Sequence, residues 1–275
     1  MSQAAVAANT AANPAEVLYS VANHVATITL NCPERMNTIS HTMLGEITEL
    51  MLKADNDPAV RVIVLTGTGR AFCAGLDLTS ATKGEGGVAN ASSNPSNLDL
   101  KATPPTVMFN LEKPLIAALN GPAAGYGLDM ALIADIRLMA RGAKLSAAFV
   151  KRGILPESGG TWLLPKLLGW SKAAELIFTG RTLDAEEALR LGLVSELVDA
   201  AELPARARAL AEEIAGNAPL AVQASKRMMR MGLNETFHDH VHHVFLQLLP
   251  LLRSADAREG MLAFLEKRTA DFKGK

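Results

Sequence analysis

Two different spacings of apolar residues mark the first predicted elements of the chain. Val25–Leu30 alternates apolar residues with threonines, and this period of two is typical of a half-buried strand. From residue 40 to residue 54 the apolar positions recur at helical spacing, before Asp57 and Pro58 predict a turn. The sequence therefore predicts a strand followed by an amphipathic helix.

Three further apolar runs are continuous and do not alternate. They cover residues 62–65, 114–119 and 135–139, and the first ends in the letters TGTG. A short continuous run is typical of a strand buried on both faces of a parallel sheet. Because these strands alternate with helical patterns, we expect an α/β fold and not a sandwich or a bundle.

The end of the chain is almost entirely helical in pattern. The predicted helical stretches are residues 205–214, 218–231 and 255–267. Asp184 and Glu187 have capping-box spacing, so they predict a further helix that ends near Gly192. These patterns predict three parts, which are a flexible tail over 1–15, a core over 16–200 and a helical domain over 201–275.

One long segment interrupts the alternation of strands and helices. Residues 79–105 are rich in Gly, Ser, Asn and Pro and include the letters GEGG. A connection of this length is typical either of a mobile functional loop or of a disordered segment, and the residues leave both open.

The composition excludes several classes of partner. With 49% hydrophobic residues in 275, the chain can bury a large core, and its net charge of -1 provides no general field for nucleic acid or acidic membranes. No uninterrupted apolar run approaches the roughly 18 to 20 residues that span a bilayer. Cys32 and Cys73 match neither a disulfide framework nor a zinc site. We therefore expect a cytoplasmic protein without a metal site, a nucleic-acid partner or a membrane partner.

Two glycine-rich turns follow predicted strands and are the strongest candidates for chemistry. The first, NGPAAGYG over residues 120–127, precedes the apolar run LDMALIA, which places unpaired backbone N–H groups at a helix start. Such a turn can hold a phosphate or a reaction oxyanion, or it can be a tight connection without a ligand. The second, GRAFCAGLDL over residues 69–78, follows another buried strand, so the two turns could aim one N–H each at a single oxygen.

Six motifs in chain order resemble those of the enoyl-CoA hydratase/isomerase (crotonase) superfamily over roughly residues 17–275. They are NCPERMNTIS, VRVIVLTGTGRAFCAGLDL, KPLIAALNGPAAGYGLDMALIADIRL, LPESGGTWLLPKLLG, TGRTLDAEEALRLGLVSELV and DAREGMLAFLEKRTADFKGK. The resemblance implies a crotonase-like spiral of ββα repeats with a C-terminal helical trimerisation domain. It also implies a homotrimer or a dimer of trimers, with an acyl-CoA thioester as the substrate and no separate cofactor.

The resemblance also implies the positions that bind the thioester. Two backbone N–H groups that form an oxyanion hole fall on Leu76 and Tyr126, where most relatives carry glycine at the second position. A Cβ at that position restricts the backbone, and the tyrosine side chain could equally be packing. The implied coenzyme A contacts are Arg35, the backbone of Cys73, Ala74, Leu76, Asp77 and Leu78, and Phe264 and Lys267 of the last helix, which a neighbouring subunit often supplies.

The acidic positions separate two reactions. Hydratases of the family usually hold a water with two glutamates, which fall here on Asp129 and on Phe149, and a phenylalanine transfers no proton, so it can only line the acyl pocket. Glu157 occupies the position where isomerases of the family carry the single base that moves a proton from C2 to C4. We therefore expect isomerisation of a 3-enoyl-CoA to a 2-enoyl-CoA by Glu157, with Asp129 as a helper.

Two alternatives stay open at this point. Asp129 and Glu157 together could hold a water and hydrate an enoyl-CoA, or the chain could bind acyl-CoA without catalysis. The histidine-rich letters HDHVHH place His238 and His242 on one helical face, but no third metal ligand is evident, so we interpret them as surface or subunit interface.

Overall fold

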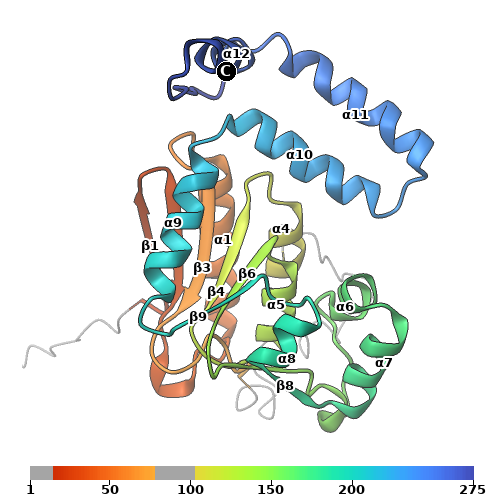
Figure 1. The fold of residues 1–275 in the computed structure, drawn as a ribbon. Helices are drawn as coiled ribbons and strands as arrows, with labels where there is room; N and C mark the ends of the chain where they lie inside the picture. The colour runs from red at the N-terminus through yellow and green to blue at the C-terminus, as the bar shows by residue number, and fades with distance from the viewer. Residues whose placement is uncertain (1–14, 78–102) are drawn as a thin grey trace, which may run out of the picture.

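The computed structural model describes residues 15–77 and 103–275 (Figure 1). Nearly all of the predicted tail, Leu78 and most of the segment 79–105 lie outside these residues. The main sheet has six strands in the order β1-β2-β3-β4-β6-β9. The strands are β1 Val17–Ala22, β2 Val25–Leu30, β3 Val62–Gly67, β4 Leu115–Leu119, β6 Ile136–Ala140 and β9 Glu196–Val198.

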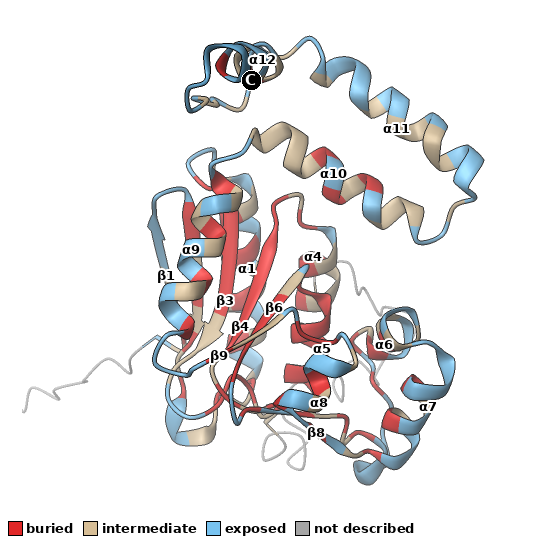
Figure 2. Ribbon diagram, in the orientation of Figure 1, coloured by how far each residue is buried: buried red, intermediate tan, exposed pale blue. Residues whose placement is uncertain are grey.

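The parallel strands confirm the predictions made from the continuous apolar runs. β1 pairs antiparallel with β2, and every other neighbouring pair in this sheet is parallel. All five residues of β4 are buried, and Figure 2 shows β3 and β4 as the most buried part of the sheet. Burial on both faces explains why these strands do not alternate apolar and polar residues.

A second, three-stranded sheet lies beside the main sheet. It contains β5 Ala123–Ala124, β7 Lys144–Ser146 and β8 Thr182–Asp184. Isolated bridges between Ile39 and Leu76 and between Cys73 and Ala123 extend it. The strands β2, β3, β4 and β6 are each followed by a short extended piece before the chain reaches its next helix, and this repetition is the predicted ββα spiral, which the structure confirms.

Capping residues in the sequence mark the starts of several helices. Their bounds are α1 His41–Asn56, α4 Pro104–Asn110, α5 Tyr126–Ile133, α6 Gly160–Leu168, α7 Trp170–Thr179, α8 Ala185–Arg190, α9 Leu203–Ala215, α10 Pro219–Gly232, α11 Phe237–Leu251 and α12 Ala255–Glu266, with 3-10 turns at Pro33–Arg35 and Val150–Arg152. The Ser40 hydroxyl accepts from the Met43 N–H at the start of α1, and Asp184 accepts from the Glu187 N–H, as its capping-box position predicts.

The predicted helical domain over 201–275 contains two kinds of helix. α9 packs on β2, β3, β4 and β6, so it is a layer of the core and not part of an appendage. The helices α10, α11 and α12 extend beyond the sheet at the top of Figure 1. The packing therefore changes after α9, whereas the sequence pattern places the change at residue 200 because helical periodicity does not report what a helix covers.

Candidate active site

The two glycine turns lie side by side. The Ala124 N–H donates to the Cys73 carbonyl at 3.0 Å, and the Cys73 N–H donates to the Pro122 carbonyl at 3.2 Å. Gly75 has a φ of 109°, and a Cβ there would lie 3.1 Å from the Ala124 carbonyl oxygen. The turn after β3 thus packs on the turn after β4 at a distance that a side chain at Gly75 would disturb.

Both predicted oxyanion-hole N–H groups lie at this junction. The Ile39 N–H donates to the Gly75 carbonyl, and the Asp77 N–H donates to the Ile39 carbonyl, so the Leu76 N–H points away from Ile39. Tyr126 is the first residue of α5, where an N–H has no acceptor within the helix. Among the described residues, neither N–H donates a hydrogen bond. Both N–H groups are therefore unpaired within the part of the chain that the structure describes, and their role as an oxyanion hole stays a prediction.

Gly125 removes the conformational difficulty expected at Tyr126. Its φ of 53° lies in the left-handed region, which glycine adopts without a steric cost. The helix then begins with Tyr126, which is not among the residues of positive φ. The tyrosine Cβ therefore imposes no strain on the turn.

Asp129 is a buried acid and lies one helical turn after Tyr126. Asp129 is 0% exposed, and its Oδ2 accepts a hydrogen bond from the Ser158 N–H at 3.2 Å. Burial, and then the nearby charge of Glu157, raise the pKa of Asp129 to about 7, although the backbone N–H groups of Ser158 and Gly160 moderate the shift. Oδ1 stays without a hydrogen-bond partner among the described residues.

Glu157 lies on the loop before α6 and is exposed, unlike its neighbours Pro156 and Ser158. Its Oε1 accepts from the Ser158 hydroxyl at 3.4 Å. The charge of Glu157 raises the pKa of both Asp129 and Tyr126, so its carboxyl group lies near both residues. Two acids from different motifs thus meet at one place, and only one of them reaches solvent.

Phe149 lies at the same place on its buried side. It is 2% exposed, and its Cε1 lies 4.0 Å from the position that a Cβ of Gly125 would occupy. Its ring contacts the glycine turn and supplies an apolar wall. The predicted position in an acyl pocket stays a prediction, although the location fits it.

The predicted coenzyme A residues of the first motifs also gather. Arg35 forms ion pairs with Glu16 and with Asp77, the latter at 3.8 Å, and its Nη2 donates to the Cys32 Sγ at 3.0 Å. Cys73 is fully buried, and burial raises its pKa to about 12, so its thiol stays neutral. Ala74 and Leu76 are half-buried beside it, and Leu78 lies outside the described residues.

Phe264 and Lys267 are not brought to this place within one chain. Phe264 is 83% exposed on α12, and Lys267 follows the end of that helix. α12 lies at the opposite end of the molecule from α5 in Figure 1. A single chain therefore assembles the turns and the acids without these two residues.

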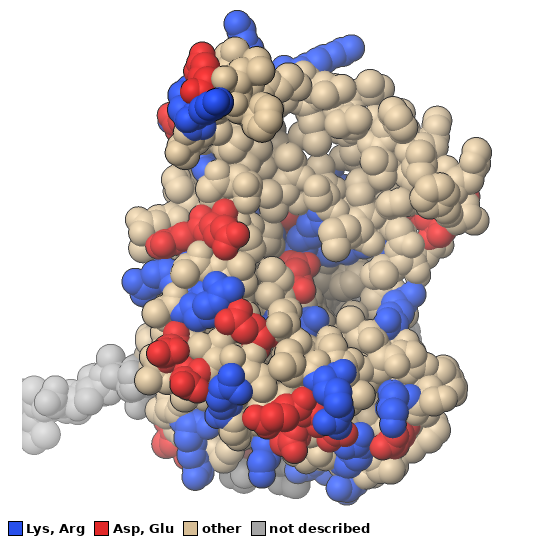
Figure 3. Space-filling view, viewed as in Figure 1, with Lys and Arg blue, Asp and Glu red and all other residues tan. Residues whose placement is uncertain are grey.

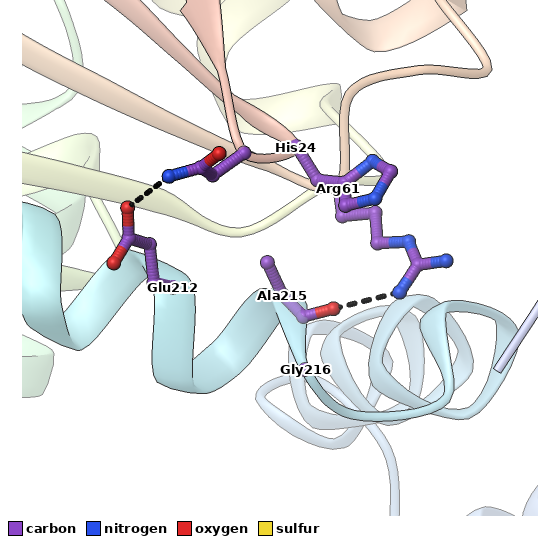
Figure 4. A pocket seen from close by; sticks show the side chains of 6 residues that line it. His24, Arg61, Glu212, Ala215 and Gly216 are labelled. Atoms are coloured by element: carbon purple, nitrogen blue, oxygen red, sulfur yellow. Dashed lines mark hydrogen bonds between the residues drawn. The ribbon is translucent and has the colours of Figure 1, made fainter. Parts of the chain in front are cut away.

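A separate pocket lies where the β1–β2 turn meets the end of α9 (Figure 4). Its volume is about 310 Å³, and its lining residues are Asn23, His24, Arg61, Glu212, Ala215 and Gly216. Arg61 donates to the Ala215 carbonyl at 2.9 Å and to the Phe272 carbonyl at 2.6 Å, and the Asn23 amide donates to Glu212. These bonds tie the C-terminal segment to the core, and none of the predicted site residues lines the pocket.

The histidine-rich segment forms a hydrogen-bonded cluster at the start of α11. His240 and His243, and not His238 and His242, lie beside Glu235, with distances of 3.1 and 3.0 Å. Within residues 15–77 and 103–275, no three His, Cys, Asp or Glu side chains come together as metal ligands. In the same residues no helix is both long enough and apolar enough to cross a bilayer.

Comparisons with known proteins support the resemblance. The family model for enoyl-CoA hydratase/isomerase matches residues 20–275. The chain is 37% identical to the (E)-benzylidenesuccinyl-CoA hydratase of Thauera aromatica, covering 94% of this chain and 99% of that protein. It is 40% identical to the carnitinyl-CoA dehydratase of Escherichia coli K12, covering 90% of this chain and 94% of that protein.

The fold has close structural relatives as well. A crystal structure of an enoyl-CoA hydratase from Bacillus anthracis superposes with a TM-score of 0.87 at 33% identity, covering 95% of this chain and 100% of that chain. An enoyl-CoA hydratase from Mycobacterium tuberculosis superposes with a TM-score of 0.86 at 33% identity, covering 94% and 99%.

Proposed function

This chain belongs to the enoyl-CoA hydratase/isomerase family and is an enzyme, and we propose that it moves a double bond of an acyl-CoA from position 3 to position 2, with Glu157 as the single base. The observation that supports this choice is the different exposure of the two acids at the site. Glu157 is exposed, whereas Asp129 is 0% exposed. Phe149 occupies the place where a second acid would be needed for the usual hydratase arrangement.

The proposed reaction uses one carboxylate twice. Glu157 removes a proton from C2, and the electrons move into the thioester, whose oxygen becomes an enolate oxygen. The N–H groups of Leu76 and Tyr126 stabilise this oxygen more strongly than the ground-state carbonyl, and one such donor contributes roughly 100- to 1000-fold in rate. Glu157 then returns the proton to C4, which leaves the double bond between C2 and C3.

Asp129 acts in this proposal as the helper that holds the base in place. Its carboxyl group accepts from the Ser158 N–H, directly after Glu157 in the chain, and a Cβ at Gly160 would lie 3.1 Å from its Cγ. The start of α6 is therefore packed tightly against Asp129. An error of about 1 Å in the position of a catalytic group can cost on the order of 100-fold in rate, so this packing matters for Glu157.

Hydration is the second candidate, and two observations favour it. The pKa of Asp129 is raised to about 7, which suits a general base or acid at neutral pH. The named relatives are a hydratase and a dehydratase. In that reaction Asp129 and Glu157 would hold one water between them.

The exposed apolar surface of the last helices supports a proposed homotrimer or dimer of trimers. None of the residues of α11 is buried, although Phe245 and Leu249 are apolar and 59% and 52% exposed. Figure 3 shows few charged side chains over α10 and α11, in contrast to the mixed charges of the lower part. A second copy covering this surface could supply Phe264 and Lys267 to the coenzyme A of its neighbour.

The test compares a 3-enoyl-CoA and a 2-enoyl-CoA as substrates of the parent and of Glu157→Gln. We expect the variant to lose isomerisation by roughly 100- to 10,000-fold, because it cannot accept the proton. Glu49→Gln makes the same change at an exposed position of α1 and serves as the matched control. Isomerisation is measured from the absorbance of the conjugated thioester, and hydration from its loss.

Two other outcomes contradict the proposal. Efficient hydration by the parent that survives Glu157→Gln would return the catalytic role to Asp129. Coenzyme A binding without turnover of either substrate would favour a non-catalytic acyl-CoA-binding protein.

A further inference from the structure

The hydroxyl of Tyr126 is buried without a hydrogen-bond partner among the described residues. The residue is only 6% exposed, so water does not solvate its side chain freely. Most buried polar side-chain atoms have a partner, and an exception in a candidate site needs an explanation. The N–H of this residue has a predicted role, whereas its phenol has none.

The phenol is enclosed and belongs to the same face of α5 as Asp129. Tyr126 and Asp129 are three residues apart on this helix, so their side chains are neighbours on its surface. Burial is the main cause that raises the pKa of Tyr126, and the negative charge of the nearby acids adds to it. The phenol stays protonated and has a proton to donate.

We propose that the Tyr126 hydroxyl recognises the acyl group, by donating a hydrogen bond to a neutral oxygen carried by the acyl chain beyond the thioester. This inference rests on the proposed acyl-CoA function and names the class of acyl chain. The N–H of Tyr126 would hold the thioester oxygen, and its hydroxyl, a whole side chain away, would contact a substituent farther along. One residue thus contacts the substrate at two separate points.

The surroundings decide which oxygen fits. A hydrocarbon chain would leave the hydroxyl unpaired, and sites with a buried polar group discriminate strongly against substrates that cannot pair with it. A carboxylate would lie beside Asp129 and Glu157, whose negative charges repel it. A hydroxyl, ether or keto oxygen avoids both penalties.

The chain contains a matched control for this phenol. It has two tyrosines, and the hydroxyl of Tyr19 is also buried without a partner among the described residues. Tyr19 lies on β1 under the Lys53 ammonium, which is 4.6 Å from the ring centroid. No predicted site residue lies on β1, so Tyr19→Phe removes an equivalent hydroxyl outside the site.

The experiment measures kcat/KM for two substrates of nearly equal size, 3-hexenoyl-CoA and 5-hydroxy-3-pentenoyl-CoA, in which a hydroxyl replaces the terminal methyl group. We expect the parent and Tyr19→Phe to prefer the hydroxylated substrate by roughly tenfold, which corresponds to one hydrogen bond. Tyr126→Phe should reduce this ratio to about one. A ratio near one in the parent, or an unchanged ratio in Tyr126→Phe, would overturn the proposal.

A second measurement keeps this inference separate from the reaction. The dissociation constants of hexanoyl-CoA and 5-hydroxypentanoyl-CoA do not depend on any proton transfer, so they test recognition even if Glu157 is not the base. A preference for the hydroxylated ligand that Tyr126→Phe abolishes would support the inference, and equal affinities in the parent would overturn it.

Thermal unfolding of Tyr126→Phe adds a third test. Removal of an unpaired hydroxyl should not lower the midpoint of unfolding. A clear decrease would reveal a structural partner of the hydroxyl and contradict the inference.

Discussion

The helices α5 and α11 both contain many apolar residues but have opposite environments. All eight residues of α5 are buried, and the helix packs against α4, α6 and β5. No residue of α11 is buried, and this helix packs against α10. Figure 2 shows the contrast between the red of α5 and the blue and tan of α11. Hydrophobicity thus selects residues for burial, but the elements around a helix decide whether burial happens within the chain.

The contrast also separates two uses of apolar surface. Around α5 the apolar surface encloses the candidate site. Burial there raises the pKa of Asp129 and leaves the Tyr126 hydroxyl without a hydrogen-bond partner among the described residues. Around α11 large apolar side chains stay exposed, which on a folded protein is typical of an interaction surface. Three experiments test this contrast.

The largest effect is expected from Gly127→Ala in α5. A Cβ there would lie 2.7 Å from the Cys73 Cβ and 2.9 Å from its Sγ, so the two glycine turns would have to separate. We expect a loss of about 3 kcal/mol in the free energy of unfolding, as for other overpacked cores. Chemical denaturation measures it.

Gly45→Ala in α1 is the control for that substitution. Apart from the backbone of its own helix, no atom of the described residues lies within 4 Å of the added Cβ, so the helix should gain roughly 0.5 to 1 kcal/mol relative to glycine. Equal effects of the two substitutions would contradict the claim that α5 is tightly enclosed.

A second large effect is expected from Phe245→Glu on α11. If a second copy covers this face, a buried and unpaired glutamate would prevent association. We expect the mass in solution, measured by light scattering, to fall from that of an oligomer to that of one chain. Leu52→Glu on α1 replaces another exposed apolar residue, 44% exposed, and should leave the mass unchanged. A parent of monomeric mass would refute the assembly.

The third effect is a gradual one, a pH dependence of stability caused by Asp129 that is small for each pH unit. The pKa of this carboxyl is about 7 in the folded chain and near 3.9 in an unfolded one, so the folded chain retains a proton between these values. Rising pH therefore destabilises the folded chain through that window, by on the order of 1 kcal/mol per unit. Above pH 7 the loss is complete.

The difference between the parent and Asp129→Asn isolates this contribution. We expect the stability of the parent relative to the variant to decrease from about pH 4 to about pH 7, when unfolding is measured at each pH. Parallel curves for the two proteins would show that Asp129 does not keep a proton in the folded chain.

Much of the central sheet could be predicted from local patterns. Residues 62–65 and 114–119 are continuous apolar runs, and β3 and β4 lie there because short apolar runs between turns favour buried strands. The helix after Ser40 follows from its apolar spacing and its cap. β1, β5, β7, β8 and β9 were not predicted. The last four have only two or three residues, which are too few to show a period.

The residues of the candidate chemistry can be read from the sequence, since glycines, carboxyl groups and a phenylalanine at motif positions are recognised from their letters. Which acid is enclosed and which is exposed depends instead on the packing of the folded chain. Asp129 and Glu157 are 28 residues apart in the chain, and their exposure depends on how α6 packs against α5. Burial is a property of the neighbours that folding brings together, so neither acid's own surroundings in the sequence could reveal it.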